Sequence, residues 1–472
     1  MIVNGRTRNH FRGHGLNNGD PKKDNPSWIV VNNNKTRALW RKTISMPEIR
    51  KSTVVLPELF VVLVLSAWSW VVANDGEPNW SRFRGPNGSG VCDLYQFPTQ
   101  IGPAKIVWQV ALDGAGHASP VVRNGRVFVA SADPETGRQV LAAYSTENGK
   151  LIWQHLLPGE FFPKHAFNSF ASSTPALDEK QLYYAWAIPK SLRLIAVAQE
   201  TGEIVWDRDL GPFVSQHGFG ASPIVYKDLV ILPNEQDGES FIVALDCATG
   251  SVRWKTPRKS EKTAYSTPTI LRIAGAKDQL ILTSWAHGVA SLDPLSGTPL
   301  WELPIFHNRT VGSPLVVNDL IVASSGEGGI GREMFVVRAG IPETGRQPKI
   351  HYEIRGSLPY VTTSVAYQGL LYLLFDKGIV ICQNLDDGQV FWKERIPGEY
   401  FSSPLVLGGK LYCLSRSGTL VVLATGKEYQ LLGQYDFGEP THATPAVADG
   451  LLLIRTLRTL FAIKALNSAP QK

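Results

Sequence analysis

Residues 222–254 read SPIVYKDLVILPNEQDGESFIVALDCATGSVRW, and this stretch decides the fold. Four short apolar segments, 222–226, 229–232, 241–245 and 251–254, are separated by polar residues of the kinds that form tight turns. Short segments joined in this way predict antiparallel strands connected by hairpins. Four consecutive strands of this kind predict one blade of a β-propeller.

The opening of this unit recurs along the chain. A Ser-Pro or Thr-Pro step precedes an apolar strand, and Thr363-Ser364-Val365 stands where one further step is due, with the proline lost. The steps begin at Ser119, Thr174, Ser222, Thr267, Ser313, Ser403 and Thr444. Their spacing of 40 to 55 residues is the period of propeller blades. Proline is tolerated at the start of an inner strand, because a missing ladder N–H costs least there.

A second signature closes the unit, a Gly followed four residues later by a Trp. It occurs as Gly149 with Trp153, Gly202 with Trp206, Gly250 with Trp254, Gly297 with Trp301 and Gly388 with Trp392. Glycine supplies the positive φ of the turn, and the tryptophan on the outer strand is expected to pack on the neighbouring blade. We therefore assign a structural docking role to Trp108, Trp153, Trp206, Trp254, Trp301 and Trp392.

The two ends of the repeat region complement each other. Residues 106–108 form an outer strand with no inner strands before it, whereas the segment that begins at Thr444 lacks a closing Gly-x-x-x-Trp. The N-terminal strand is therefore predicted to complete the last blade. The expected fold is all-β, an eight-bladed propeller of four-stranded blades whose ring is closed by an N-terminal strand. A seven-bladed ring is the alternative, because residues 326–340 of the sixth repeat break the pattern.

The motif Ala244-x-Asp246-x-x-x-Gly250-x-x-x-Trp254 resembles the docking motif of the quinoprotein-type propellers, which are built from PQQ-like repeats. The resemblance covers about residues 78–466 and includes secreted, BamB-like members that are not catalytic. Residues 79–88, NWSRFRGPNG, resemble the opening motif of many secreted bacterial members. The resemblance implies either a binding scaffold or, in its enzymatic branch, a quinone-dependent dehydrogenase.

The front of the chain differs from the repeats. Residues 1–45 are a polar, basic extension, which is not translated if synthesis starts at Met46 instead of Met1. Residues 46–73 combine basic residues, an uncharged apolar run and small residues before a cleavage position, which is typical of a signal peptide. An uncleaved signal anchor is the alternative. In both cases the propeller, residues 78–466, is expected in the periplasm or cell envelope, followed by a tail of residues 467–472.

The charge distribution argues against one class of partner. The formal net charge is +6, but residues 1–52 hold 11 Lys and Arg against 3 Asp and Glu, so the remaining body is close to neutral. A basic face that would neutralise phosphates is not indicated. We expect protein partners in the cell envelope and no nucleic acid. We also expect a monomer that associates with the membrane only through an uncleaved N-terminal segment.

The variable residues just before each strand opening are the candidates for binding. Loops that lead into the inner strands of a propeller gather at one mouth of its channel. The candidates are His117, Asn168, His217, Tyr265, Arg309, Tyr360, Tyr400 and His442. The channel mouth and its rim loops, including the insertion at residues 161–170 and the long loop of the sixth repeat, form the predicted binding surface. The alternative is that these side chains only line a polar channel and wedge adjacent blades apart.

We assign no catalytic residue and no metal site. His117, His217 and His442 belong to different repeats and have no carboxylate in their motif. The enzymatic branch of the resemblance holds PQQ over calcium beside a disulfide between adjacent cysteines, and the four cysteines here are far apart. Neither PQQ nor calcium is therefore expected. The predicted function is a non-catalytic binding or scaffold module for protein partners. An oxidoreductase or other enzyme that binds a small ligand at the mouth is the alternative, and an envelope-assembly factor is a third hypothesis.

Overall fold

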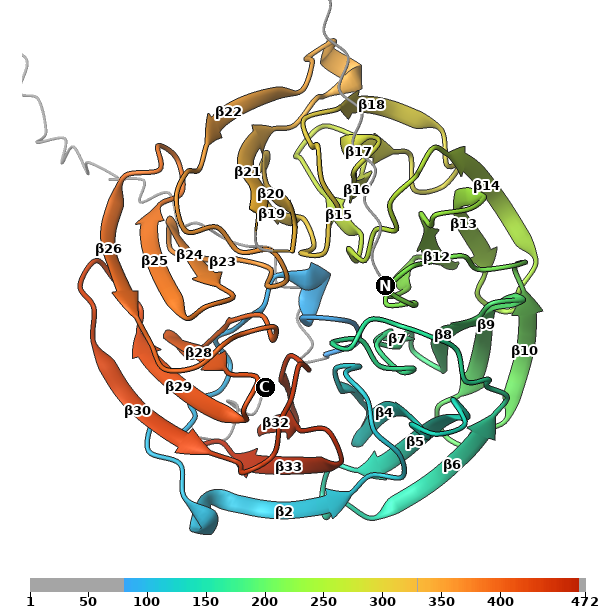
Figure 1. Ribbon diagram of the computed structural model, residues 1–472, viewed down its shortest axis with the longest axis vertical. Helices are drawn as coiled ribbons and strands as arrows, with labels where there is room; N and C mark the ends of the chain where they lie inside the picture. Colours follow the sequence, from blue (N-terminus) through green and yellow to red (C-terminus); the bar gives the residue numbers. More distant parts are fainter. Residues whose placement is uncertain (1–79, 329, 467–472) are drawn as a thin grey trace, which may run out of the picture. The chain divides into compact units, whose positions relative to one another are not determined.

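The computed structural model describes residues 80–328 and 330–466, which form eight antiparallel sheets around a central axis (Figure 1). Strands that follow one another in sequence pair within each sheet, except that β1 pairs parallel with β27 and β2 pairs with β33, so each sheet is one blade. The interpretations of residues 1–45 and 46–73 and of the tail lie outside the described residues. Within those residues, no helix is long and apolar enough to cross a membrane.

Blade 1 consists of β3 (Val121–Arg123), β4 (Arg126–Ala132), β5 (Gln139–Ser145) and β6 (Leu151–Leu157), and blade 2 of β7 (Ala176–Leu177), β8 (Gln181–Ile188), β9 (Ser191–Ala198) and β10 (Ile204–Asp209). Blade 3 consists of β11 (Ile224–Tyr226), β12 (Leu229–Asn234), β13 (Ser240–Asp246) and β14 (Val252–Arg258), and blade 4 of β15 (Thr269–Leu271), β16 (Gln279–Ser284), β17 (Gly288–Leu292) and β18 (Pro299–Leu303). Blade 5 consists of β19 (Leu315–Val317), β20 (Leu320–Glu327), β21 (Ile330–Arg338) and β22 (Lys349–Glu353), and blade 6 of β23 (Val365–Tyr367), β24 (Leu370–Phe375), β25 (Ile379–Asn384) and β26 (Val390–Arg395). Blade 7 consists of β27 (Leu405–Leu407), β28 (Lys410–Leu414), β29 (Thr419–Ala424) and β30 (Leu431–Asp436), with β1 (Val91–Cys92) added inside β27. Blade 8 consists of β31 (Ala446–Ala448), β32 (Leu451–Arg455), β33 (Thr459–Lys464) and β2 (Ile106–Ala111), and the 3-10 helices are η1 (Pro86–Gly88), η2 (Pro103–Lys105) and η3 (Pro342–Thr344).

The ring closes through its N-terminal strand, as predicted. β2 is the outer strand of blade 8 and pairs antiparallel with β33, with Trp108 opposite Ala462. The eight-bladed prediction is confirmed and the seven-bladed alternative is wrong. The irregular repeat folds as a complete fifth blade, because β20 and β21 form a long hairpin and β22 follows as the outer strand.

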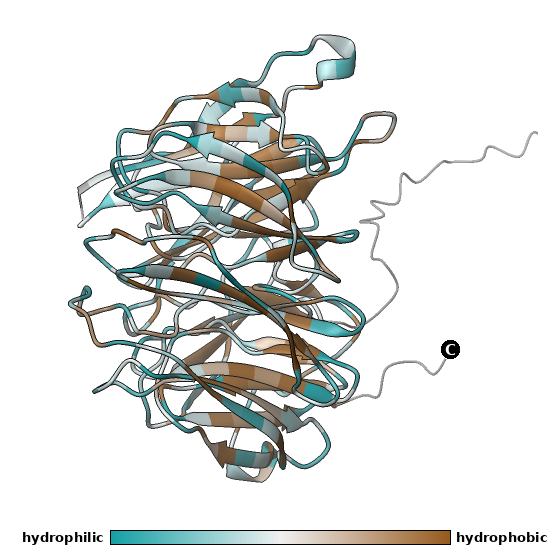
Figure 2. Ribbon diagram, turned by 90° about the vertical axis from the view of Figure 1, so that its right-hand side faces the viewer, coloured by the Kyte–Doolittle hydropathy of each residue, from teal (hydrophilic) through white to brown (hydrophobic). Residues whose placement is uncertain are grey.

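The apolar core is divided among the interfaces between blades. One cluster joins blades 2 and 3 around Tyr183 and Leu232, and another joins blades 6 and 7 around Tyr372 and Val406. The side view shows apolar residues concentrated in the strands and polar residues in the connecting loops (Figure 2). Each blade therefore depends on its neighbours, and closing the ring leaves no exposed end blade.

Outer-strand tryptophans join consecutive blades through the following glycine turn. Trp206 of blade 2 donates its Nε1–H to the Cys247 carbonyl of blade 3 at 2.8 Å. Its ring covers Gly250, where φ is 67° and an added Cβ would lie 2.6 Å from the ring. Blade 5 carries Tyr352 at this position, and its hydroxyl donates to the Leu385 carbonyl at 2.8 Å. The irregular repeat thus keeps the contact with a different aromatic residue.

The strand-opening hydroxyls form a girdle of hydrogen bonds around the channel. In each bond the backbone N–H of one Ser or Thr donates to the side-chain oxygen of the equivalent residue on the next blade, at 2.9 to 3.0 Å. The bonded pairs are Ser119 with Thr174, Thr174 with Ser222, Thr267 with Ser313, Ser313 with Thr363, Thr363 with Ser403, Ser403 with Thr444 and Thr444 with Ser119. The feature that these strand openings share is therefore the side-chain hydroxyl, and Thr363 has this hydroxyl although no proline follows it.

The opening motif runs along the inner edges of the blades, in blue at the centre of Figure 1. Trp80 bridges to Val122 of blade 1, and Asn87 exchanges two hydrogen bonds with the backbone of Ile270 in blade 4. The fully buried Arg84 donates to carbonyls of blades 6 and 7, at 2.8 Å to Ser364 and 3.0 Å to Pro404. Because inner strands have no further strand to pair with, this segment satisfies edges that would otherwise stay open.

Candidate functional site

The connection between β6 and β7 crosses one mouth of the channel, and we call residues 158–170 the cap. His165 of the cap stacks on His217, from the loop between blades 2 and 3, with ring centroids 4.9 Å apart. Phe167 contacts Phe401, from the loop between blades 6 and 7, at 5.4 Å between centroids. These two loops lie on opposite sides of an eight-bladed ring, so the cap spans the mouth.

His442 anchors one side of the cap. Its Nδ1–H donates to the Phe167 carbonyl at 3.2 Å, and its Nε2 accepts from Arg416 Nε at 3.3 Å. Its ring stacks on His117 with centroids 4.0 Å apart. Burial, with the Arg416 guanidinium beside it, lowers the pKa of His442 to about 4. The pKa of His117 is lowered well below its ordinary value, first by burial and then by His442. Both rings are therefore neutral at pH 7.

His217 anchors the other side. Its Nε2 lies 3.4 Å from Nη1 of Arg309, whose Nε donates to the Thr263 carbonyl at 3.1 Å. Burial, and secondly Arg309, lowers the pKa of His217. Asn168 of the cap donates from Nδ2 to the His217 carbonyl at 2.7 Å. On this side the cap is thus held by a hydrogen bond from the Asn168 side chain to the backbone and by stacked histidine rings.

Two tyrosines complete the mouth beside Arg309. The Tyr265 hydroxyl lies 3.3 Å from Ser215 Oγ, and burial raises the pKa of Tyr265 to about 12. Burial also raises the pKa of Tyr360, whose ring lies 5.9 Å from the Arg332 guanidinium. Both phenols are protonated at pH 7 and serve as hydrogen-bonding groups with aromatic faces.

The structure brings most of the predicted site residues together and separates one. His117, Asn168, His217, Tyr265, Arg309, Tyr360 and His442 lie around the cap. Tyr400 instead belongs to the core between blades 6 and 7, where its hydroxyl donates to the Pro397 carbonyl. Its chain neighbour Phe401 faces the mouth, because successive side chains in extended backbone point in opposite directions.

Sequence reasoning included the insertion at residues 161–170 in the predicted binding surface but did not single out His165 and Phe167 within it, and it missed Arg416. The Arg416 guanidinium lies 4.2 Å from the Phe167 ring centre and 4.6 Å from that of Phe401, and it pairs with Glu399 at 2.6 Å. Arg416 lies in the turn between β28 and β29. Such turns share a face with the loops into the inner strands, because a four-stranded antiparallel blade reverses direction three times. The position of Arg416 in such a turn is therefore the sequence signal that points to it.

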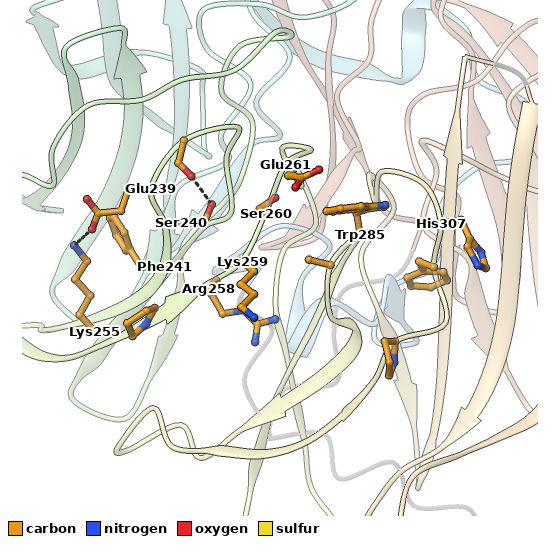
Figure 3. A pocket seen from close by; sticks show the side chains of 15 residues that line it. Glu239, Ser240, Phe241, Lys255, Arg258, Lys259, Ser260, Glu261, Trp285 and His307 are labelled. Atoms are coloured by element: carbon orange, nitrogen blue, oxygen red, sulfur yellow. Dashed lines mark hydrogen bonds and ion pairs between the residues drawn. The ribbon is translucent and has the colours of Figure 1, made fainter.

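A groove lies farther out on the same face, between blades 3 and 4, with a volume of about 860 Å³ (Figure 3). Trp285 stands on one side of it and the Lys255–Glu239 ion pair on the other, with Lys259 between them. Phe241 and Phe306 form buried apolar parts of its lining. Sequence reasoning placed no residue here, because Trp285 belongs to no repeated motif.

A quinone held over calcium is the cofactor of the enzymatic branch of the resemblance. Calcium requires several free oxygen ligands. The acidic side chains of the mouth are engaged: Asp376 pairs with Arg332 at 3.0 Å and Glu399 with Arg416 at 2.6 Å. Among residues 80–328 and 330–466, no three His, Cys, Asp or Glu side chains are grouped for a metal. The carboxylates of Asp376 and Glu399 are therefore both already engaged by arginines.

Comparisons with known proteins show the family and the fold to which the chain is similar. The family model described as "Outer membrane protein assembly factor BamB" matches residues 100–183, 137–340 and 356–428. None of the curated proteins matches significantly. Among solved structures, a europium-containing methanol dehydrogenase has a TM-score of 0.64 at 12% identity, covering 83% of this chain and 99% of its own.

Two further structures are similar in fold. BamB from Moraxella catarrhalis has a TM-score of 0.56 at 17% identity, covering 77% of this chain and 98% of its own. Quinohemoprotein alcohol dehydrogenase from Comamonas testosteroni has a TM-score of 0.57 at 15% identity, covering 84% and 82%. At these identities the likeness concerns the fold alone. The family model matches more than half of the chain, and the chain therefore belongs to the BamB-type family of PQQ-like repeat propellers.

Proposed function

We propose that this protein is a non-catalytic binding module of the cell envelope and that it docks protein partners on the face formed by the channel mouth and cap. The observation that carries the proposal is the exposure of two aromatic side chains on a well-anchored cap. The Phe161 and Phe167 side chains are 60% and 47% exposed. Large exposed aromatic residues on a rigid platform are typical of protein-binding hot spots.

The chemistry around the cap supports binding rather than turnover. The pKa values of His442 and His117 are lowered below that of an ordinary histidine, so neither imidazole exchanges protons readily near pH 7. The nearby carboxylates of Asp376 and Glu399 form ion pairs with Arg332 and Arg416. The family's description as an assembly factor for outer membrane proteins supports an envelope location and a scaffolding role.

The test replaces Phe161 and Phe167 with Ser in the full chain and compares the proteins that co-purify from envelope extracts. We expect one or more partners to be reduced at least ~10-fold, because two hot-spot side chains are lost. A matched control replaces Val390, which is 53% exposed on the outer strand β26, with Ser. Equal recovery with both variants would contradict the assignment of this face.

A second experiment addresses the enzymatic alternative. The full chain is incubated with PQQ and calcium, and the absorption spectrum and melting temperature are recorded after gel filtration. We expect no bound chromophore and no change in melting temperature, because the acidic side chains of the mouth are paired with arginines. A retained chromophore with a higher melting temperature would show a cofactor site and overturn the non-catalytic proposal.

A further inference from the structure

The outer strand of each blade has one edge that pairs with no other described strand, and Figure 1 shows these edges around the circumference of the ring. Within such a strand, the backbone N–H and C=O groups of alternate residues point into the sheet, and those of the residues between them point outward. In blade 1 the Ser145 N–H of β5 donates to the Lys150 carbonyl at 2.8 Å, which fixes this alternation for β6. The backbone groups of Gln154 and Leu156 in β6 therefore point outward.

Charged residues and prolines protect most of these edges. The two outward positions lie one and three residues after the docking position, which Trp153 occupies in blade 1. Blades 2 to 7 carry at least one charge or proline at these positions, and such residues discourage the addition of a further strand. In chain order they are Asp207 and Asp209, Lys255 and Pro257, Glu302 and Pro304, Glu353 and Arg355, Lys393 and Arg395, and Gln434 and Asp436. The edges of blades 1 and 8 lack this protection, because they carry Gln154 with Leu156 and Gln109 with Ala111.

The edge of blade 1, strand β6, is the longer and the more apolar of these two. It reads Leu-Ile-Trp-Gln-His-Leu-Leu and contains no Lys, Arg, Asp, Glu or Pro. The side chains of Leu151, Ile152 and Leu156 are 52%, 42% and 53% exposed. His155 faces blade 2, where its Nε2–H donates to the Gly202 carbonyl. A long, uncharged edge with exposed apolar side chains is a site at which a further strand can add.

The order of residues in β6 indicates which strand adds to it. Residues 151–157 are apolar at both ends and have Gln154 at the centre, so the pattern is the same in either direction. Two copies of β6 that run antiparallel place Ile152 of each copy opposite Leu156 of the other, and Gln154 opposite its own counterpart. A two-fold interface requires a surface that is complementary to itself, and this strand meets that requirement.

We propose that the protein forms a symmetric dimer in which β6 of one copy pairs antiparallel with β6 of a second copy. The outward backbone groups of Gln154 and Leu156 then gain hydrogen-bonding partners, and the exposed side chains of Ile152 and Leu156 pack across the interface. β6 runs toward the mouth and continues into the cap at residue 158, so antiparallel pairing points the two mouths in opposite directions and leaves both free. This dimer replaces the monomer expected from the sequence, and it does not depend on the proposed function.

The test measures the mass of the full chain by sedimentation velocity over a range of protein concentrations. We expect a dimer for the wild type and a dimer dissociation constant at least ~10-fold higher for Leu156→Lys, because each lysine replaces an apolar contact with a charge at the interface. Leu156→Pro should also weaken the dimer, since it removes an outward N–H without adding a charge. The matched control is Val390→Lys, because Val390 is equally exposed on β26, and this variant should dimerise like the wild type.

Hydrogen exchange distinguishes strand pairing from other modes of association. The amides of residues 151–157 should exchange more slowly in concentrated samples than in dilute ones, whereas the exchange of the β26 amides should not change. Circular dichroism and melting temperature check that the variants fold, and proline at the position of Leu156 is compatible with a blade because Pro257 and Pro304 occupy it in blades 3 and 4. The inference is overturned if the wild type is monomeric at every concentration, if Leu156→Lys dimerises as tightly as the wild type, or if the β6 amides exchange equally fast in both samples.

Discussion

Acid is expected to release the cap from the channel mouth, and His442 is the main cause. Its Nε2 accepts a hydrogen bond from Arg416, and its ring stacks on His117. Protonation would turn Nε2 into a donor that faces the Arg416 donor and would place two positive charges in contact. The other groups that face it are the Phe167 carbonyl, which still accepts from Nδ1, and the Phe401 ring.

The size of the effect follows from the pKa of His442, which is lowered from 6.5 to about 4. That difference corresponds to about 3 kcal/mol in favour of the neutral ring, and about 2 kcal/mol remains after allowance for its partial exposure. Because the folded-state pKa is lowered, this stabilisation is complete above pH 6.5 and is lost as the pH falls toward 4. A loss of about 2 kcal/mol raises the population of the open cap roughly 30-fold.

Hydrogen exchange of the cap amides measures this opening. The Asn168 N–H, which donates to the His165 carbonyl at 2.9 Å, is a suitable reporter within the cap. We expect its protection factor, corrected for intrinsic exchange, to fall roughly 30-fold between pH 7 and pH 4. His442→Gln keeps a donor and an acceptor but cannot be charged, so its protection should depend much less on pH. Equal pH dependence in the wild type and this variant would refute the role of His442.

Three further predictions concern the ring. Thr444→Val leaves the buried Ser403 N–H of the girdle without an acceptor and should lower the free energy of unfolding, measured by denaturant titration, by about 1–3 kcal/mol. The control, Ser364→Ala, removes a hydroxyl with no described partner and should leave the free energy of unfolding nearly unchanged. Arg84→Lys keeps the charge but cannot reach carbonyls of two blades, so it should lower the melting temperature, and an unchanged value would contradict the stabilising role of the opening motif. Gly250→Ala should lower the free energy of unfolding more than Gly356→Ala. Both glycines have positive φ, but only at Gly250 would the added Cβ meet a neighbour, the Trp206 ring at 2.6 Å.

The repeat pattern was enough to predict the blades, their number and the closing strand. It did so because a strand opening recurs in every blade and the Gly-to-Trp turn in five of them, and each has a local physical cause. Two features were beyond it. The girdle could not be predicted, because its bonds join residues some forty or more positions apart whose hydroxyls looked like turn residues. The docking role of Tyr352 could not be predicted from the Gly-x-x-x-Trp motif, because that motif requires a tryptophan.

The candidate site was harder to predict than the fold. Loop positions before the strand openings identified most residues around the cap, since the propeller geometry brings those loops together. The side-chain direction at Tyr400 and Phe401 depends on the local backbone and could not be read from the sequence. The path of the cap across the mouth was also unpredictable, because it depends on contacts of Phe167 with loops far away in sequence.

Site-specific photo-crosslinking in the envelope tests the central claim most directly. Benzoylphenylalanine replaces Phe161 or Phe167 on the mouth face, or Val390 on the outer strand as a control. The account predicts covalent adducts with the same protein partner from both mouth positions and none from Val390. Adducts that form equally from all three positions, or only from Val390, would contradict a binding surface at the capped mouth.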